Sequence, residues 1–269
     1  MNITVNAQPV FAYTGGKPFD AAKPTVVFIH GVLNDHSVWI LQSRWFAHHG
    51  WNVLAIDLPG HCKSKGAPPK SVEEAAQFVI ALLDAAGVER AALIGHSFGS
   101  LIALEAAARA PERITHLALV GTAYPMKVSP ALLEASLNEP QRAIAMVNTF
   151  SHSMLAPPPS SLGPGTWLYG SSRALMRRVL ASNREVNVFH TGFNACNSYA
   201  NGEAAIVAVR CPVLFLLGTA DQMTPVAVAQ QLAARSRDAR VVTVEAGHSL
   251  MSEAPDAVLF ALADFLGAR

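Results

Sequence analysis

Several short segments of this chain are apolar at every position, and longer segments of helical character separate them. A run such as Val26-Val27-Phe28-Ile29 has no polar position that could face water, which is typical of a parallel strand covered by helices on both faces of a sheet. This alternation predicts an α/β fold with a doubly wound, mostly parallel sheet. The expected strands are 25–29, 52–56, 91–94, 114–120, 213–217 and 240–244, with two short ones in 1–13, and the expected helices are 37–49, 71–86, 100–110, 225–235 and 255–266.

The alternation is interrupted between Gly121 and Pro212. This stretch contains a proline-rich loop and two amphipathic runs, near residues 141–154 and 167–182, without a convincing strand. We therefore expect a helical cap inserted into one α/β core domain. The predicted boundaries are 1–123 and 208–269 for the core and 124–207 for the cap.

Composition narrows the range of partners and compartments. The 269 residues are 51% hydrophobic with a net charge of +1, so nothing favours a nucleic acid or an acidic membrane, and a small-molecule partner is expected. The N-terminal residues lack the basic start and long apolar run of a secretory signal or membrane anchor. Cys62, Cys196 and Cys211 are odd in number and widely spaced, which argues against a disulfide scaffold and a zinc site. We expect a cytoplasmic protein.

The segment Gly95-His96-Ser97-Phe98-Gly99 lies between an apolar strand and an alanine-rich helix. A serine in so sharp a strand-to-helix turn adopts a strained backbone conformation, and the two glycines let strand and helix pass closely. The turn would expose the Ser97 hydroxyl and direct the first N–H groups of the helix, with their positive dipole, at the group that the serine attacks. The pattern predicts Ser97 as a nucleophile. The alternative is that Ser97 only caps the helix.

Two further side chains are predicted at the same edge of the sheet, where catalytic groups of open α/β folds gather beyond the carboxyl ends of the strands. Asp221 follows the strand 213–217, and His248 follows the last strand. A serine hydroxyl needs a base within reach and a third group that orients the base, so we predict His248 and Asp221 in these roles. The alternatives are a structural loop histidine and a capping aspartate, although Thr224, directly before Pro225, is the better candidate for the cap.

The end of the first core strand, His30-Gly31-Val32, supplies a candidate oxyanion hole. Backbone N–H groups fixed around a developing oxyanion lower the barrier by roughly 3 kcal/mol per donor. The expected donors are the N–H groups of Val32 and Phe98. His30 is expected to hold this loop in place rather than to act as a base.

These motifs, in the order Ser97, Asp221, His248, resemble those of the α/β-hydrolase fold family. The likeness includes Asp57-Leu-Pro-Gly-His61, Gly218-x-x-Asp221-x-x-x-Pro225 and Gly247-His248-x-x-x-x-Glu253-x-Pro255, and it covers the chain outside the expected cap. It implies an eight-stranded, mostly parallel sheet, a Ser-His-Asp triad, no cofactor, and a cap that shapes the acyl or alcohol pocket. Cys62 departs from the pattern because similar proteins carry glycine there, and we expect an inert rather than a reactive thiol.

Serine at position 97 separates this chain from similar dehalogenases and epoxide hydrolases, which attack with aspartate. We expect a carboxylesterase-like serine hydrolase that forms an acyl-enzyme, as a monomer or weak homodimer, on a substrate with an apolar acyl or alcohol part. Lactone hydrolysis, carbon-carbon bond hydrolysis, cofactor-free perhydrolysis and a receptor without turnover are the alternatives. The scattered histidines show no metal-binding spacing, so no metal site is expected.

Apolar residues of the expected cap are candidates either for a pocket lining or for contacts that hold the cap to the core. Arg173 and Arg177 are four positions apart, so they could share a substrate carboxylate or form a solvated face. His152 and His190 could contact a polar group of the substrate or be solvated. The pocket candidates are Met126, Met146, Phe150, Met154, Trp167, Leu168, Met176, Phe189 and Phe193.

Overall fold

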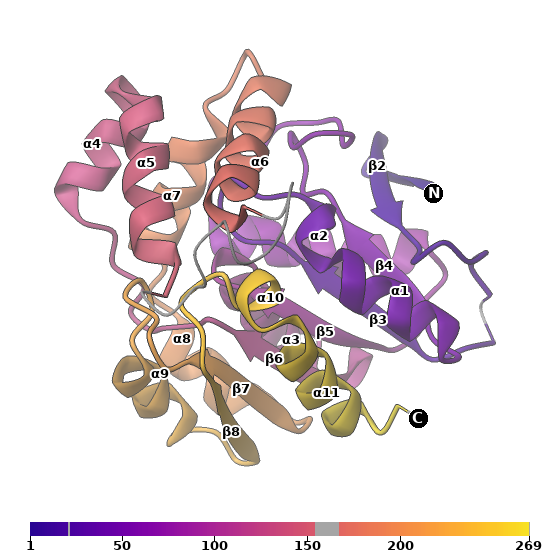
Figure 1. Cartoon of the computed structure of the whole chain (residues 1–269). Coiled ribbons are helices and arrows are strands. Elements are labelled where there is room, and N and C mark those ends of the chain that lie inside the picture. Colours follow the sequence, from indigo (N-terminus) through magenta and orange to yellow (C-terminus); the bar gives the residue numbers. More distant parts are fainter. Residues whose placement is uncertain (21, 154–166, 269) are drawn as a thin grey trace.

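The computed structural model of the chain describes residues 1–20, 22–153 and 167–268, and its centre is one eight-stranded sheet. The spatial order is β1-β2-β4-β3-β5-β6-β7-β8 (Figure 1). β1 pairs with β2, and β2 with β4, in antiparallel fashion, and all other neighbours are parallel, which confirms the predicted sheet. The strands are β1 (Asn2–Val5), β2 (Gln8–Tyr13), β3 (Thr25–Ile29), β4 (Asn52–Ile56), β5 (Ala91–His96), β6 (Ile114–Val120), β7 (Val213–Gly218) and β8 (Ala239–Val244).

Helices cover both faces of the sheet because successive residues of each inner strand point to opposite sides. In β3, Val27 and Ile29 pack with α2 and α3 on one face, whereas Val26 and Phe28 pack with α1 and α11 on the other. This two-sided burial explains why positions 26–29 of the strand are all apolar. Outside the stretch between β6 and β7, the helices are η1 (His36–Trp39), α1 (Ile40–His48), α2 (Val72–Ala85), α3 (Phe98–Arg109), η2 (Pro111–Arg113), α9 (Val226–Ala233), α10 (Leu250–Glu253) and α11 (Pro255–Leu266).

The helix expected over 37–49 is divided in two. Its first turn is the 3-10 helix η1, where the Asp35 side chain caps the backbone N–H of Ser37, and the α-helical part begins at Ile40. The capping carboxylate fixes the start of this segment, because it accepts a donor that has no partner within the helix.

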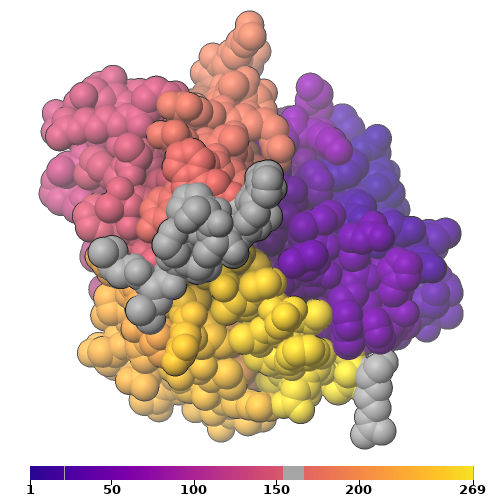
Figure 2. All heavy atoms as spheres, in the orientation of Figure 1, coloured from indigo at the N-terminus to yellow at the C-terminus, as the bar shows by residue number. Residues whose placement is uncertain are grey.

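The described residues of the stretch between β6 and β7 form helices and connecting loops, and no strand. The helices α5 and α6 match the two predicted amphipathic runs, and together with α4 and α7 they share an apolar cluster that includes Leu132, Ile144, Val179 and Phe189. In contrast, Ile206 of α8 packs in the cluster that contains α2 and α3. In Figures 1 and 2, α4, α5, α6 and α7 gather on one side of the molecule. The helices are α4 (Pro130–Asn138), α5 (Pro140–Ser151), α6 (Leu168–Ser182), α7 (Val188–Ser198) and α8 (Gly202–Ala208).

None of the helices in the described ranges is both long and apolar enough to cross a membrane.

Candidate active site

Ser97 joins β5 to α3 in a strained backbone conformation, with φ of +54° and ψ of −119°. A non-glycine residue with positive φ costs on the order of 1–3 kcal/mol, so the surrounding structure must impose it. A Cβ atom on Gly95 would lie 2.0 Å from the carbonyl oxygen of Gly99, and one on Gly99 would lie 2.4 Å from that of Ile29. Both glycines are therefore required by close backbone contacts. Ser97 stands at the N-cap position of α3, but its side chain makes no capping hydrogen bond.

Asp221, after β7, and His248, after β8, form a buried pair. Nδ1 of His248 lies 2.8 Å from Oδ2 of Asp221, and the two residues are only 5% and 6% exposed. Burial by itself would raise the pKa of Asp221, but the charge and hydrogen bond of His248 together with the Thr224 donors hold it below its ordinary value. An ionised Asp221 accepts a hydrogen bond from Nδ1–H of His248, and this tautomer leaves Nε2 as the nitrogen that can take up a proton.

Thr224 supports this pair instead of capping the next helix. Its hydroxyl donates to Oδ2 of Asp221 at 2.6 Å and lies 3.1 Å from Nδ1 of His248. The N-cap of α9 is Pro225, which has no side-chain capping bond, so the expectation of a Thr224 cap is wrong. The buried carboxylate needs donors, and Thr224 supplies two of them, since its backbone N–H binds Oδ1 of Asp221.

His96, directly before the candidate nucleophile, holds the His248 loop from the sheet side. Its Nε2 donates to the backbone carbonyl of His248 at 2.8 Å, and the two rings lie 4.8 Å apart. Burial, and then the neighbouring His248, lower the pKa of His96 to about 3, so its ring is neutral. Sequence reasoning did not assign this role, and the only signal was the position of His96 at the end of β5.

The end of α5 holds the same loops from the other side. The carbonyl of Ser151 accepts the N–H of Ser249 at 2.8 Å, and the Ser151 hydroxyl donates to Sδ of Met223 at 3.0 Å. The N–H of Ser153 donates to Oε2 of Glu253 at 2.9 Å. A Cβ atom on Gly247 would lie 2.6 Å from the nitrogen of Ser153. Residues 151–153 thus contact the loops of both Asp221 and His248.

Ser97 and His248 line two cavities together, of about 250 and about 50 Å³. Within the described ranges, no hydrogen bond joins the Ser97 hydroxyl to His248. Such contacts are often long in an empty site and shorten when substrate binds. The structure therefore brings the three predicted side chains to one place. Among the described residues, the hydrogen bond between Asp221 and His248 is formed, whereas one between Ser97 and His248 is not.

The loop after β3 lies beside Ser97, as the predicted oxyanion hole requires. A Cβ atom on Gly31 would lie 3.1 Å from Cβ of Ser97, and Val32 lines both cavities. His30 fixes this loop, because its Nδ1 donates to the carbonyl of Gly31 at 2.9 Å and its Nε2 accepts the N–H of Leu58 at 3.1 Å. Burial lowers the pKa of His30, which agrees with a neutral, structural ring.

Five of the nine expected pocket residues line one of three spaces. Met126, Phe150 and Phe193 line the 250 Å³ cavity and Met176 lines the 50 Å³ one, while Leu168 lines a separate cleft of about 690 Å³. The remaining candidates do not line these spaces: Phe189 is buried among the helices, Met146 packs against them, Trp167 is 46% exposed, and Met154 lies outside the described residues.

The other polar candidates in this region have partners of their own. Nε of Arg177 donates to Gln141 at 2.8 Å, and the guanidinium of Arg173 lies 5.8 Å from the Trp167 ring centre. His152 stacks on Tyr169, with ring centres 4.4 Å apart, and Nδ1 of His190 bonds to the Ser136 hydroxyl at 2.9 Å. These four side chains line none of the three cavities described above.

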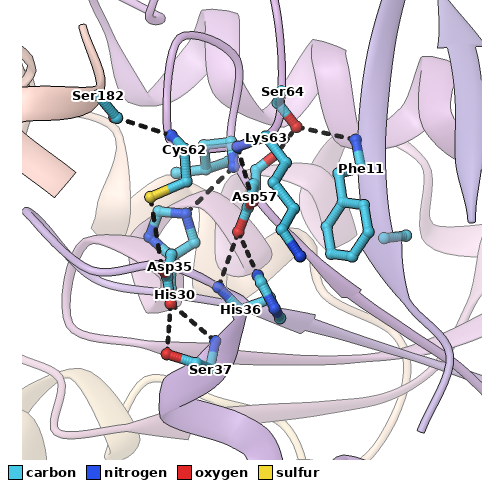
Figure 3. A network of polar contacts seen from close by, with 12 residues as sticks. Phe11, His30, Asp35, His36, Ser37, Asp57, Cys62, Lys63, Ser64 and Ser182 are labelled. Atoms are coloured by element: carbon cyan, nitrogen blue, oxygen red, sulfur yellow. Dashed lines mark hydrogen bonds and ion pairs between the residues drawn. The ribbon is translucent and has the colours of Figure 1, made fainter. Parts of the chain in front are cut away.

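Cys62 belongs to a second polar network, which Figure 3 shows from close by. Its thiol donates to Oδ2 of Asp35 at 3.3 Å, and burial followed by the Asp35 charge raises the pKa of Cys62 to about 12. The thiol is therefore protonated and inert at neutral pH. Cys62 has φ of +44°, in the left-handed region that favours glycine, so the loop keeps the conformation a glycine would adopt.

The same network brings ligand atoms of Asp35, His36 and Asp57 within 4.8 Å of one another. Both carboxylates already accept protein donors: Asp57 accepts from His36 and the N–H of Lys63, and Asp35 accepts from Ser37, Cys62 and Arg178. The donor set therefore fits a closed hydrogen-bond network rather than a metal centre. The bond from Arg178 of α6, at 2.6 Å, also ties that helix to η1.

The profile of the alpha/beta hydrolase fold family matches residues 24–255. The chain belongs to the α/β-hydrolase family. It is 26% identical to an (E)-2-((N-methylformamido)methylene)succinate hydrolase of Acinetobacter baylyi, over 87% of this chain and 86% of the relative. It is 28% identical to a pimeloyl-(acyl-carrier protein) methyl ester esterase of Neisseria meningitidis, over 84% and 70%.

Solved structures agree with this family membership. The enol-lactonase of Burkholderia xenovorans LB400 superposes with a TM-score of 0.84 at 23% identity, covering 99% of this chain and 100% of that one, which shows a shared fold. Two dihydrolipoyllysine-residue acetyltransferase components of acetoin cleaving systems, from Pseudomonas putida and Cupriavidus necator, match over only 26% of their own length. The chain thus belongs to a family of hydrolytic enzymes, and the two relatives that it covers over most of their length are named as a hydrolase and an esterase.

Proposed function

We propose that this hydrolase cleaves carboxylic esters through a Ser97-His248-Asp221 triad. The observation that carries the proposal is the buried Asp221–His248 pair, joined by a 2.8 Å hydrogen bond, whose His248 lines the same cavity as Ser97 in its strained turn. A serine hydroxyl with its ordinary pKa reacts slowly at neutral pH, and an oriented, neutral imidazole is the group that removes its proton.

The proposed reaction has two halves. Nε2 of His248 takes the Ser97 proton as the hydroxyl oxygen attacks the ester carbonyl, and it then returns that proton to the departing alcohol, which leaves an acyl-enzyme. In the second half, His248 deprotonates a water molecule, which releases the acid and restores the serine. Asp221 holds the ring tautomer and stabilises the imidazolium. The N–H groups of Val32 and Phe98 are the proposed oxyanion donors.

Carboxylic esters are supported by the methyl ester esterase among the relatives. Hydrolysis of a lactone, a cyclic ester, uses the same steps and is the second candidate, supported by the likeness to an enol-lactonase. Carbon-carbon hydrolysis and perhydrolysis stay as unsupported alternatives.

We further propose that residues 124–207 act as a cap over the site, with α8 at its base against α3. Helices of this stretch supply much of the 250 Å³ cavity wall, including Leu132, Val147 and Phe193. The three free cysteines are compatible with a cytoplasmic protein, and a monomer or weak homodimer is proposed.

The test is Ser97→Ala, assayed with p-nitrophenyl acetate. The variant should fold, as shown by an unchanged circular dichroism spectrum, and lose activity by at least about a thousandfold. Ser236→Ala, far from the cavities, is the matched control and should keep wild-type activity. A fluorophosphonate should label wild type on Ser97 and leave Ser97→Ala unlabelled. Near-wild-type turnover by Ser97→Ala would overturn the proposal.

A further inference from the structure

The cavity shared by Ser97 and His248 is small and mostly apolar. Its volume of about 250 Å³ lies below the 300–1,000 Å³ typical of drug-sized ligands, so it fits a short chain. Met126, Val128, Leu132, Val147 and Phe150 form most of its apolar wall. No aspartate or glutamate is among the described residues that line it.

A second space accounts for the other half of an ester. The cleft of about 690 Å³ contains neither Ser97 nor His248, and it shares His96 and Ser249 with the 50 Å³ cavity that does contain them. In an acyl-enzyme the acyl group stays bonded to the serine while the alcohol departs. We therefore assign the acyl chain to the 250 Å³ cavity and the departing alcohol to the larger cleft.

Lys127 lines the 250 Å³ cavity that is assigned to the acyl chain. It is the one lysine or arginine among the described residues lining the 250 and 50 Å³ cavities. Its Nζ donates to the backbone carbonyl of Asn197 at 3.1 Å, while the Asn197 side chain accepts the N–H of Val128 at 3.3 Å. Asn197 thus holds the Lys127 ammonium group and the backbone of Val128, and both of these neighbouring residues line the cavity.

The Lys127 ammonium retains donors for a ligand. An ammonium group has three N–H donors, and within the described ranges one is used and no carboxylate lies within ion-pair distance. The first turn of α4, through Ser129 and Leu132, lines the same cavity, and the positive end of this helix dipole adds to the potential there. The described residues that line the cavity are therefore mostly apolar and include one lysine but no aspartate or glutamate.

We propose that Lys127 binds a terminal carboxylate on the acyl chain, so that the preferred substrates are esters or lactones of short dicarboxylic acids. The inference rests on the proposed function of Ser97, because it places the acyl group relative to that residue. A short apolar chain with a carbonyl group at one end and a carboxylate at the other matches a cavity that is lined by Ser97, by Lys127 and mostly by apolar side chains.

The experiment compares p-nitrophenyl hemiadipate with p-nitrophenyl hexanoate, which have the same acyl length and differ in the terminal carboxylate. With uncatalysed rates subtracted, wild type should have the higher kcat/KM for the hemiadipate. Lys127→Met should lower kcat/KM for the hemiadipate by about tenfold, as expected for the loss of a charge-assisted hydrogen bond, and change that for hexanoate by less than about twofold. Lys127→Arg should retain most of the preference.

Lys17→Met, which removes an exposed charge remote from these cavities, is the matched control and should behave as wild type. Added salt should reduce the hemiadipate preference of wild type and leave Lys127→Met unaffected, because salt screens an exposed ion pair. Equal effects of Lys127→Met on both esters, or no preference in wild type, overturn this inference alone. Turnover of either ester by Ser97→Ala would instead overturn the proposed function.

Discussion

Acidification from pH 7 to pH 5 should destabilise this protein through its buried histidines. His30, His61 and His96 are all less than 5% exposed, and burial is the first cause that lowers the pKa of each ring. The values for His61 and His96 are about 4 and about 3. In the unfolded chain these rings take up protons near pH 6.5, whereas in the native state they stay neutral, so the unfolded state binds more protons and gains stability as the pH falls.

The size of the effect follows from the same values. A ring with an unfolded pKa near 6.5 that is still neutral in the fold at pH 5 costs about 2 kcal/mol relative to pH 7. His61 and His96 together therefore remove about 4 kcal/mol, a large part of the 5–15 kcal/mol of a typical domain. Asp35, Asp57 and Asp221, whose pKa values are lowered, stabilise the fold above the ordinary carboxyl value near 4 and lose that contribution only below it. The window from pH 7 to 5 thus isolates the histidines.

Urea unfolding at pH 7 and pH 5 measures the difference. His96→Gln keeps a neutral N–H donor for the carbonyl of His248 but does not titrate, so its loss of unfolding free energy should be about 2 kcal/mol smaller than that of wild type. His49→Gln replaces an exposed ring and serves as the control with the wild-type loss. If His96→Gln shows the same pH dependence as wild type, the reasoning about a buried neutral His96 is wrong.

Three further outcomes are expected. Thr224→Val removes a hydroxyl donor from the Asp221–His248 pair and should lower kcat/KM for p-nitrophenyl acetate by about tenfold with little change in KM, and an unchanged kcat would contradict its supporting role. Iodoacetamide at pH 8 should leave Cys62 unmodified in the native protein, since its pKa is about 12, and rapid alkylation seen by mass spectrometry would refute this. Gly247→Ala should lower kcat more than tenfold, because its Cβ would lie 2.6 Å from the nitrogen of Ser153 and displace the His248 loop. A wild-type kcat would show that the backbone shifts to accept the methyl group without moving His248.

The sheet was predictable because its inner strands are covered on both faces. The strands 25–29, 52–56 and 114–120 have the predicted bounds, since an apolar run buried on two sides ends where the first polar or turn residue appears. The inserted helices were harder to predict. α5 and α6 carry the amphipathic pattern that predicted them, and α7 carries one that the prediction did not recognise. In contrast, α4 and α8 have only 9 and 7 residues, too few for a clear periodic pattern.

The positions of the candidate site residues were predictable from strand ends, but their supporting contacts were not. Asp221 and His248 follow adjacent parallel strands, so the sheet order brings them together. The bond from His96 to the carbonyl of His248 joins residues 152 positions apart, and no local pattern indicates it. The direction of the Thr224 hydroxyl was mispredicted because the sequence shows a helix start and not the buried carboxylate that needs a donor.

The contact of residues 151–153 with the Asp221 and His248 loops limits how this enzyme can be redesigned. Grafting α4 to α7 from another family member would change the wall of the 250 Å³ cavity, but it would also replace the backbone that contacts Gly247 and Ser249. A chimera that keeps residues 151–153 and Glu253 preserves that joint, whereas one cut within it exchanges specificity and loop support together. Useful crossover points therefore lie outside residues 151–153 and leave Glu253 in place.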